Sequence, residues 1–228
     1  GEEKNRLAKP LTENSAAYQL YLNGLYHWNR GTESGFQEAV DYFNQAIVRD
    51  PKFALAQTGL ADTYTLMGDS GYMAPGDAWP KAKAAAMVAV GIEDSLAEAH
   101  SSLGLVKAYY DWDWVGAEKE FRRAIELNPN LAVAHNWYGS FLTKMGRRDE
   151  ALREILKARD LDPLSPLIST TLGWHYYASD QTDLAIEQLK KTLDLAPNYS
   201  PAHGRRWPPP SSQSCNQCLK ATVGCSPR

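Results

Sequence analysis

Apolar residues along this chain recur with a period of 34 residues. The clearest copies each end in a proline after an apolar, helix-like segment: Ala124–Pro129 (AIELNP), Ala158–Pro163 (ARDLDP) and Thr192–Pro197 (TLDLAP). An earlier copy ends at Pro51, and an intermediate copy has Asp94 in place of the proline. A fixed period of this length is typical of a solenoid, in which each unit buries its apolar face only by stacking on its neighbours.

Small residues repeat at fixed places inside each unit. Glycines fall in the first of two predicted helices and alanines fall early in the second: Gly104, Gly139 and Gly173, followed by Ala117, Ala151 and Ala185. A small side chain at these places lets the two helices approach closely. The proline then ends the second helix, because it lacks an N–H and forces the preceding residue into an extended conformation. Each unit is therefore predicted to be a helical hairpin.

These positions together resemble the tetratricopeptide repeat (TPR). The resemblance covers about residues 16–203 and implies an all-α fold, a right-handed α-α superhelix (TPR solenoid) of about five helix-turn-helix repeats and the start of a sixth. Residues 1–15 are predicted to be an N-terminal linker. Residues 204–228 form a tail rich in Pro, Ser and Cys, which we interpret as a disordered or artefactual end.

The first two repeats depart from the regular length. In repeat one we expect Leu22 and Tyr26 to be the packed apolar pair, with Gly24 between them. Repeat two holds nine extra residues in a segment rich in turn formers, after which Asp77 is predicted to cap the next helix. This insertion either carries function, as insertions in repeat proteins can, or folds Tyr72 and the following methionine over the core.

An aromatic run, YYDWDW at residues 109–114, makes repeat three one residue longer than the regular unit. One interpretation is an aromatic platform for a sugar or a cation. The other is structural: Asp113 caps the second helix, Trp114 fills the apolar slot at the helix turn, and Trp112 is the extra residue.

Composition and charge exclude several classes of function. The formal net charge is −3, and the basic tail leaves −7 for the rest of the chain, so nucleic-acid binding through a clustered basic face is not expected. No apolar run reaches about 18 residues, so no membrane contact by this segment is expected. The sequence has no Gly-rich phosphate loop, nucleophile elbow or His-Glu-x-x-His motif. We therefore predict neither an enzyme nor a cofactor site.

The histidines and cysteines do not indicate a metal site. His100, His135 and His203 share the fourth position of their repeats, but equivalent positions lie about 10 Å apart, which is too far for one zinc ion. The cysteines all lie in the tail, without a fourth ligand nearby: Cys215, Cys218 and Cys225. The alternative for the tail is a small metal clip made with another chain.

The first helices are predicted to line a concave groove that binds an extended peptide. The second, fifth, ninth, twelfth and thirteenth places of each repeat give the candidates. They include Thr58, Asp62, Glu98, Ser101, Tyr109, Asn136, Ser140, Lys144, Thr170, Trp174 and Tyr177. Alternatively, Trp174 and Tyr177 pack against the missing part of a sixth repeat. Since Lys144 is the one positive charge in this set, a clamp for a terminal carboxylate, as in chaperone-binding TPR domains, is not expected.

Longer strings resemble the C-terminal repeats of bacterial multidomain regulators. These strings are AYQLYLNGLYHWN at 17–29, DWDWVGAEKEF at 111–121 and LDPLSP at 161–166. Such regulators carry a kinase, cyclase or winged-helix domain upstream of the repeats. The resemblance implies a non-catalytic scaffold that binds a protein or peptide in the cytoplasm, or in the periplasm if a membrane span precedes it. The alternative is a homo-oligomerisation module that acts through an uncapped C-terminal repeat.

Overall fold

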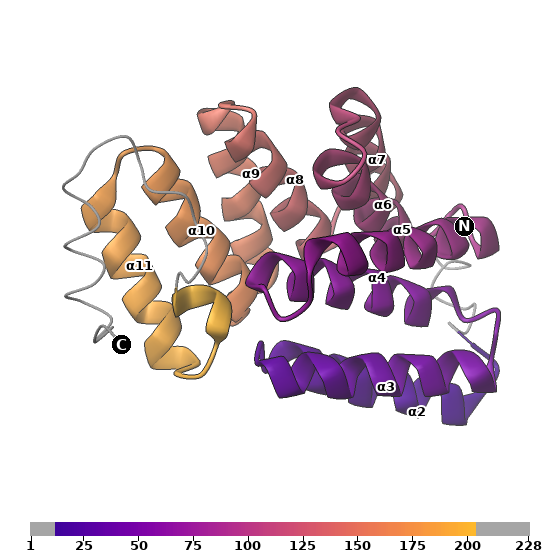
Figure 1. The fold of residues 1–228 in the computed structure, drawn as a ribbon. Helices are drawn as coiled ribbons and strands as arrows, with labels where there is room; N and C mark the ends of the chain where they lie inside the picture. Colours follow the sequence, from indigo (N-terminus) through magenta and orange to yellow (C-terminus); the bar gives the residue numbers. More distant parts are fainter. Residues whose placement is uncertain (1–11, 204–228) are drawn as a thin grey trace. The chain divides into compact units, whose positions relative to one another are not determined.

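The structure is a computed structural model that describes residues 12–203, and this part of the chain folds into consecutive helical hairpins (Figure 1). The hairpins pair α2 (Ser15–Asn29) with α3 (Glu33–Arg49), α4 (Ala54–Ser70) with α5 (Pro75–Ile92), α6 (Ala97–Tyr109) with α7 (Trp114–Leu127), α8 (Ala132–Lys144) with α9 (Arg148–Leu161), and α10 (Pro166–Ala178) with α11 (Thr182–Leu195). A short 3-10 helix, η1 (Ser200–His203), follows. The predicted all-α repeat architecture is confirmed.

The hairpins form two compact units that divide after Leu127. Unit 1 holds α2–α7. In it, α2 packs on α4, α4 packs on α6, and the second helices α3 and α5 each pack on the first helix of the next hairpin. Unit 2 holds α8–α11 and η1, and there α10 packs on both α8 and α9. We call the first helices of the hairpins the A-helices, and they lie side by side within each unit.

Glycines in the A-helices allow the close helix contacts that the sequence predicts. The ring of Phe43 in α3 fits against Gly24 and Gly59, where an added Cβ would lie 2.5 and 2.6 Å from its atoms. At Gly139 in α8 an added Cβ would lie 2.5 Å from Cγ1 of Ile155 in α9. Since real Cβ atoms do not approach so closely, a larger residue at these places would push the helices apart.

The packed face of α2 differs from the prediction for repeat one. Leu22 and Tyr26 are 39% and 67% exposed, so the expectation that they form the apolar pair is wrong. Tyr21 and Leu25 pack against the core instead. The apolar stripe of α2 is shifted by one residue because many of its residues are aromatic or aliphatic, and the pattern alone allows either face.

The insertion in repeat two lengthens both helices rather than forming a long loop. Helix α4 has 17 residues and α5 has 18, against 13 and 14 in the hairpins of unit 2. Helix α5 begins at Pro75 after Ala74, so the prediction that Asp77 caps it is wrong. Tyr72 in the short connection contacts Phe36, with ring centroids 6.1 Å apart. The insertion therefore extends the hairpin and places an aromatic side chain over the core of unit 1.

The aromatic run of repeat three forms the turn between α6 and α7. Asp113 caps α7, because its carboxylate accepts a hydrogen bond from the backbone N–H of Gly116 at 2.9 Å. Trp112 takes a left-handed backbone conformation with φ 57° and is 72% exposed. Trp114 is 48% exposed and meets Trp112 edge to face, so the expectation that it fills an apolar slot is wrong.

The end of repeat five is partly covered by η1. Tyr199 and Ala202 are buried, and η1 packs against both α10 and α11. Leu184 and Leu195 on α11 stay about half exposed. Among residues 12–203, no helix is both long and apolar enough to cross a membrane. The predictions for residues 1–11 and for the cysteine-bearing tail concern parts outside the described residues.

Candidate peptide-binding surface

The predicted groove residues lie on the A-helices of both units with very different exposure. Those at the fifth place of each repeat are buried: Thr58, Ser101, Asn136 and Thr170. Tyr177 is also buried, and Lys144 is exposed. Partly buried residues make up the rest: Asp62, Glu98, Tyr109, Ser140 and Trp174. The partly buried set therefore offers the accessible part of the A-helix surface.

Two A-helices of unit 1 each contribute a carboxylate to one place on its surface, and a third contributes a tyrosine. Asp62 of α4 accepts a hydrogen bond from the hydroxyl of Ser102 in α6 at 2.7 Å. Glu98 lies one turn before Ser102 on the same helix, and the Ser102 hydroxyl also lies 3.1 Å from the backbone carbonyl oxygen of Glu98. The charges of Glu98 and Asp62 both act on the hydroxyl of Tyr21 in α2. The sequence had placed Asp62 and Glu98 in one groove without showing that they face each other across two helices.

Burial makes these groups hard to ionise. It raises the pKa of Asp62 to about 7, the hydrogen bond from Ser102 opposes this shift, and the charge of Glu98 adds to it. Burial is also the main cause that raises the pKa of Glu98, and it raises the pKa of Tyr21 with help from both carboxylates. A ligand that supplies a positive charge would reverse these effects.

Unit 2 presents polar groups without hydrogen-bond partners on its A-helices. The amide oxygen and nitrogen of Asn136 in α8 have no partner among the described residues, and the same holds for the hydroxyl of Thr170 in α10. Both side chains occupy the fifth place of their repeats. Beside them, the hydroxyl of Thr143 and Nδ1 of His175 lie 2.9 Å apart and link α8 to α10. Since Asn136 and Thr170 are 0% and 4% exposed, these unsatisfied groups lie inside unit 2 rather than on its accessible surface.

An aromatic pair continues this surface on α10. Trp174 and Tyr177 meet edge to face with centroids 5.8 Å apart, and they belong to a cluster with Tyr176 and Ala185. Tyr177 is 7% exposed, so it contributes to the core of repeat five, while Trp174 is partly exposed. This arrangement is compatible with an apolar anchor at Trp174.

Two histidines at the fourth place of their repeats bind glutamates of the same hairpin. Nδ1 of His100 lies 2.7 Å from the carboxylate of Glu120, and Nδ1 of His135 lies 2.6 Å from that of Glu154. Each pair ties an A-helix to the second helix of its hairpin. The interpretation of His100 and His135 as part of the repeat pattern agrees with these contacts. The side chain of His203 lies outside the described set.

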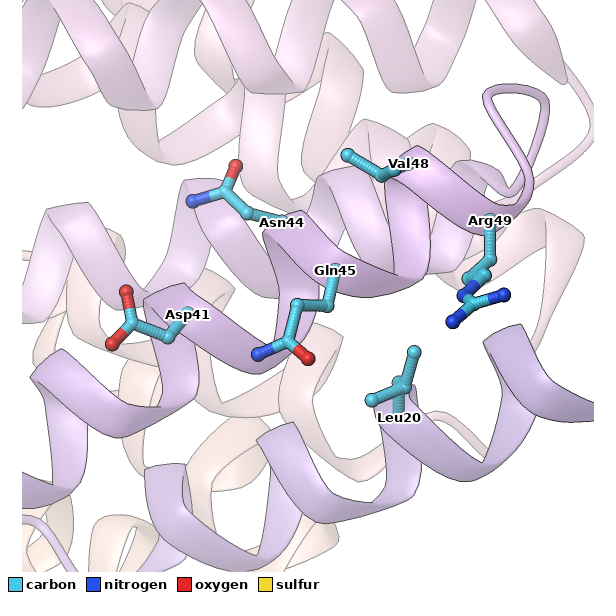
Figure 2. Close-up of a pocket in the computed structure, with 6 residues that line it drawn as sticks. All are labelled: Leu20, Asp41, Asn44, Gln45, Val48 and Arg49. Atoms are coloured by element: carbon cyan, nitrogen blue, oxygen red, sulfur yellow. The ribbon is translucent and has the colours of Figure 1, made fainter.

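A separate depression opens on unit 1 between α2 and α3 (Figure 2). It is lined by Leu20, Asp41, Asn44, Gln45, Val48 and Arg49. None of the predicted groove residues lines it, and the five residues contributed by α3 are exposed. Within the described part of the chain, no group of three His, Cys, Asp or Glu side chains could hold a metal ion.

Comparison with known proteins agrees with this geometry. Residues 142–200 match the family model described as tetratricopeptide repeat. A thermophilic TPR protein of Thermus thermophilus superposes with a TM-score of 0.62 at 18% identity, covering 92% of this chain and 100% of that chain. Residues 142–200 are tetratricopeptide repeat sequence, and the described chain has the TPR fold. At this identity the structural likeness concerns the TPR fold alone.

Two further proteins are similar to parts of this chain. The transcriptional regulator HilA of Salmonella typhimurium is 28% identical over 167 residues, which are 73% of this chain and 30% of HilA. The match therefore spans less than a third of the length of that regulator. A human IFIT1 dimer with PPP-AAAA superposes with a TM-score of 0.64 at 17% identity, covering 85% of this chain and 44% of that chain.

Proposed function

We propose that this chain is a non-catalytic module that binds a protein or peptide on the A-helices of its TPRs. The TPR fold supports an interaction role, and the observation that carries the proposal is the partly exposed surface of the A-helices in unit 2. Ser140 of α8 presents a hydroxyl there, and Trp174 of α10 presents an aromatic side chain. A peptide offers backbone donors and acceptors at regular intervals for such a hydroxyl and an apolar side chain for such an aromatic residue.

We further propose that the module is the interaction part of a larger bacterial regulatory protein in the cytoplasm. The match to a segment of the regulator HilA supports this placement. The predicted exclusion of nucleic acid rests on the acidic balance of the repeats and remains part of the proposal.

A peptide selection tests the binding function. Peptides selected from a random library against the full chain would be measured with the wild type and two variants. Ser140→Arg places a long charged side chain on the partly buried A-helix surface of α8, whereas Arg153→Glu changes an exposed residue of α9. We expect Ser140→Arg to weaken binding about tenfold or more and Arg153→Glu to leave it unchanged. Equal binding by all three proteins would show that the A-helices are not the binding surface.

The second candidate is self-association through repeat five. The observation that favours it is the exposure of Leu184 and Leu195 on α11, 46% and 51%. Exposed apolar surface at the end of a repeat array tends to find a partner. Light scattering over a concentration series, with wild type and a Leu184→Lys, Leu195→Lys variant, tests it. The mass of a monomer at every concentration in both proteins would exclude this candidate.

A further inference from the structure

The carboxylates on the A-helices of unit 1 lack compensating positive charge. Among the described residues, neither Asp62 nor Glu98 forms an ion pair, and two lysines of the same unit pair with other carboxylates. Lys83 of α5 binds Asp111 at 2.7 Å, and Lys107 of α6 binds Glu120. These two lysines therefore neutralise other carboxylates, while the Asp62–Glu98 pair is left with Ser102 and Tyr21 as neighbours. An uncompensated, partly buried charge is costly to keep in a folded protein.

A second polar group beside the carboxylates also lacks a partner. Ser101 is 1% exposed, and its hydroxyl has no hydrogen-bond partner among the described residues. Ser101 lies between Glu98 and Ser102 on one turn of α6, and these two residues face α4. By helical spacing Ser101 shares this face. The site thus holds two charges and one hydroxyl that the described chain does not satisfy.

We propose that unit 1 binds a basic side chain of a partner peptide, foremost arginine, between Asp62 and Glu98. This inference rests on the proposed function, because it names the chemistry of the peptide that the A-helices bind. It assigns a preference opposite to that of a groove that clamps a terminal carboxylate.

Arginine suits the geometry better than other side chains. Its guanidinium carries five N–H donors in a planar fork, and it can bridge carboxylates that come from two different helices. Tyr21 offers a further acceptor and an aromatic ring beside them. Both carboxyl side chains remain partly accessible, so a long, thin side chain can reach them from the A-helix surface.

A pair of matched peptides tests the charge requirement. The probe is acetyl-Ala-Ala-Arg-Ala-Ala-amide, and its control carries citrulline, which has nearly the same shape as arginine but no charge. Binding to the full chain is followed by NMR titration at pH 8. We expect the arginine peptide to bind about tenfold or more tightly than the citrulline peptide. Equal binding of the two peptides would overturn the inference.

Variants of the carboxylates locate the site. Asp62→Asn and Glu98→Gln should each reduce the preference for arginine about fivefold or more. Asp69→Asn is the matched control, since Asp69 is an exposed carboxylate on the same helix as Asp62. If Asp69→Asn reduces the preference as much as Asp62→Asn, the attraction is a general effect of net charge and the inference is wrong.

A stability measurement in the absence of any ligand gives an independent outcome. If the two charges are uncompensated, Asp62→Asn and Glu98→Gln should raise the melting temperature at pH 8, and a decrease for both would contradict the proposal. The peptides selected from the random library distinguish a failure of this inference from a failure of the proposed function. If they bind the A-helices without any preference for arginine, the inference fails while the proposed function stands. If neither they nor the arginine peptide bind, both fail.

Discussion

Nδ1 of His100 lies 2.7 Å from Oε2 of Glu120, and Nε2 of the same ring lies 2.8 Å from the backbone carbonyl oxygen of Asp94. Both partners are acceptors, so a ring that donates from both nitrogens carries a positive charge. The hydrogen bond to Glu120 raises the pKa of His100, and the same bond lowers the pKa of Glu120. A similar contact joins His135 to Glu154 in unit 2.

The His100–Glu120 pair is expected to stabilise the fold only within a pH range, which has an upper limit set by His100 and a lower limit set by Glu120. Because the pKa of His100 is raised in the folded state, its contribution is fully present below the ordinary value of 6.5 and is lost as the pH rises through the folded pKa. The lowered pKa of Glu120 gives a contribution that is present above 4.5 and is lost as the pH falls through the folded pKa. Glu120→Gln should lower the free energy of unfolding by about 1–3 kcal/mol at pH 6 and by less at pH 9.

Urea denaturation at the two pH values measures the effect. Glu126→Gln serves as the control, since Glu126 is an exposed residue of the same helix that pairs with Arg123 at 3.7 Å. The control should change stability by no more than about 0.5 kcal/mol. An equal loss for Glu120→Gln at pH 6 and pH 9 would show that the charge on His100 does not contribute.

Asp62, also in unit 1, predicts a pH dependence with the same sign as that of His100 and the opposite sign to that of Glu120. Its pKa is raised from 3.8 to about 7, so the folded state binds the proton more tightly than the unfolded state. The contribution of Asp62 to the free energy of unfolding therefore falls as the pH rises from about 4 to about 7. Asp62→Asn should remove this dependence and increase the free energy of unfolding at pH 8 by on the order of 1–3 kcal/mol. Denaturation curves between pH 5 and pH 8, read with an amide hydrogen-exchange probe in α4, would test this prediction.

The close contact at Gly139 predicts a cost for even one methyl group. An added Cβ would lie 2.5 Å from Ile155 and 3.1 Å from the backbone carbonyl oxygen of Ala151. Gly139→Ala should therefore destabilise the fold by about 1–3 kcal/mol, although alanine favours a helix. Gly91→Ala in α5 is the matched control, because an added Cβ there meets no atom within 4 Å. This control should be neutral or stabilising by up to about 1 kcal/mol. Thermal unfolding of both variants measures these effects. A Gly139→Ala variant that is more stable than the wild type would show that the contact between Gly139 and Ile155 is not close.

Tyr199 predicts how the end of repeat five is protected. The residue is 3% exposed, in a segment whose η1 packs against α10 and α11. Tyr199→Ala should cost about 3–5 kcal/mol by analogy with other large aromatic truncations, and it should increase hydrogen exchange in α11. Pro197→Ala is a suitable control, since it changes an exposed residue just before the same turn. Unchanged exchange in α11 for Tyr199→Ala would mean that burial of Tyr199 does not protect repeat five.

The sequence by itself determined the repeat, the hairpins and the glycines at which the two helices of a hairpin touch. The 34-residue period and the glycines at Gly104 and Gly139 suffice for this, because residue size and helical spacing act locally and recur in every unit. Asp113 could likewise be recognised as a helix cap, since capping depends on a hydrogen bond only three residues long in sequence.

Only the tertiary structure decided what each face of a helix contacts. The core-facing residue of α2 is Tyr21 rather than Leu22, and Asn136 is fully buried rather than exposed in a groove. The sequence does not show this, because exposure depends on which neighbouring helix packs there. The meeting of Asp62 with Ser102 joins residues 40 apart in sequence. No local pattern encodes such a contact, since it follows from the stacking of successive hairpins, and that stacking also leaves Asp62 and Glu98 without a compensating charge among the described residues.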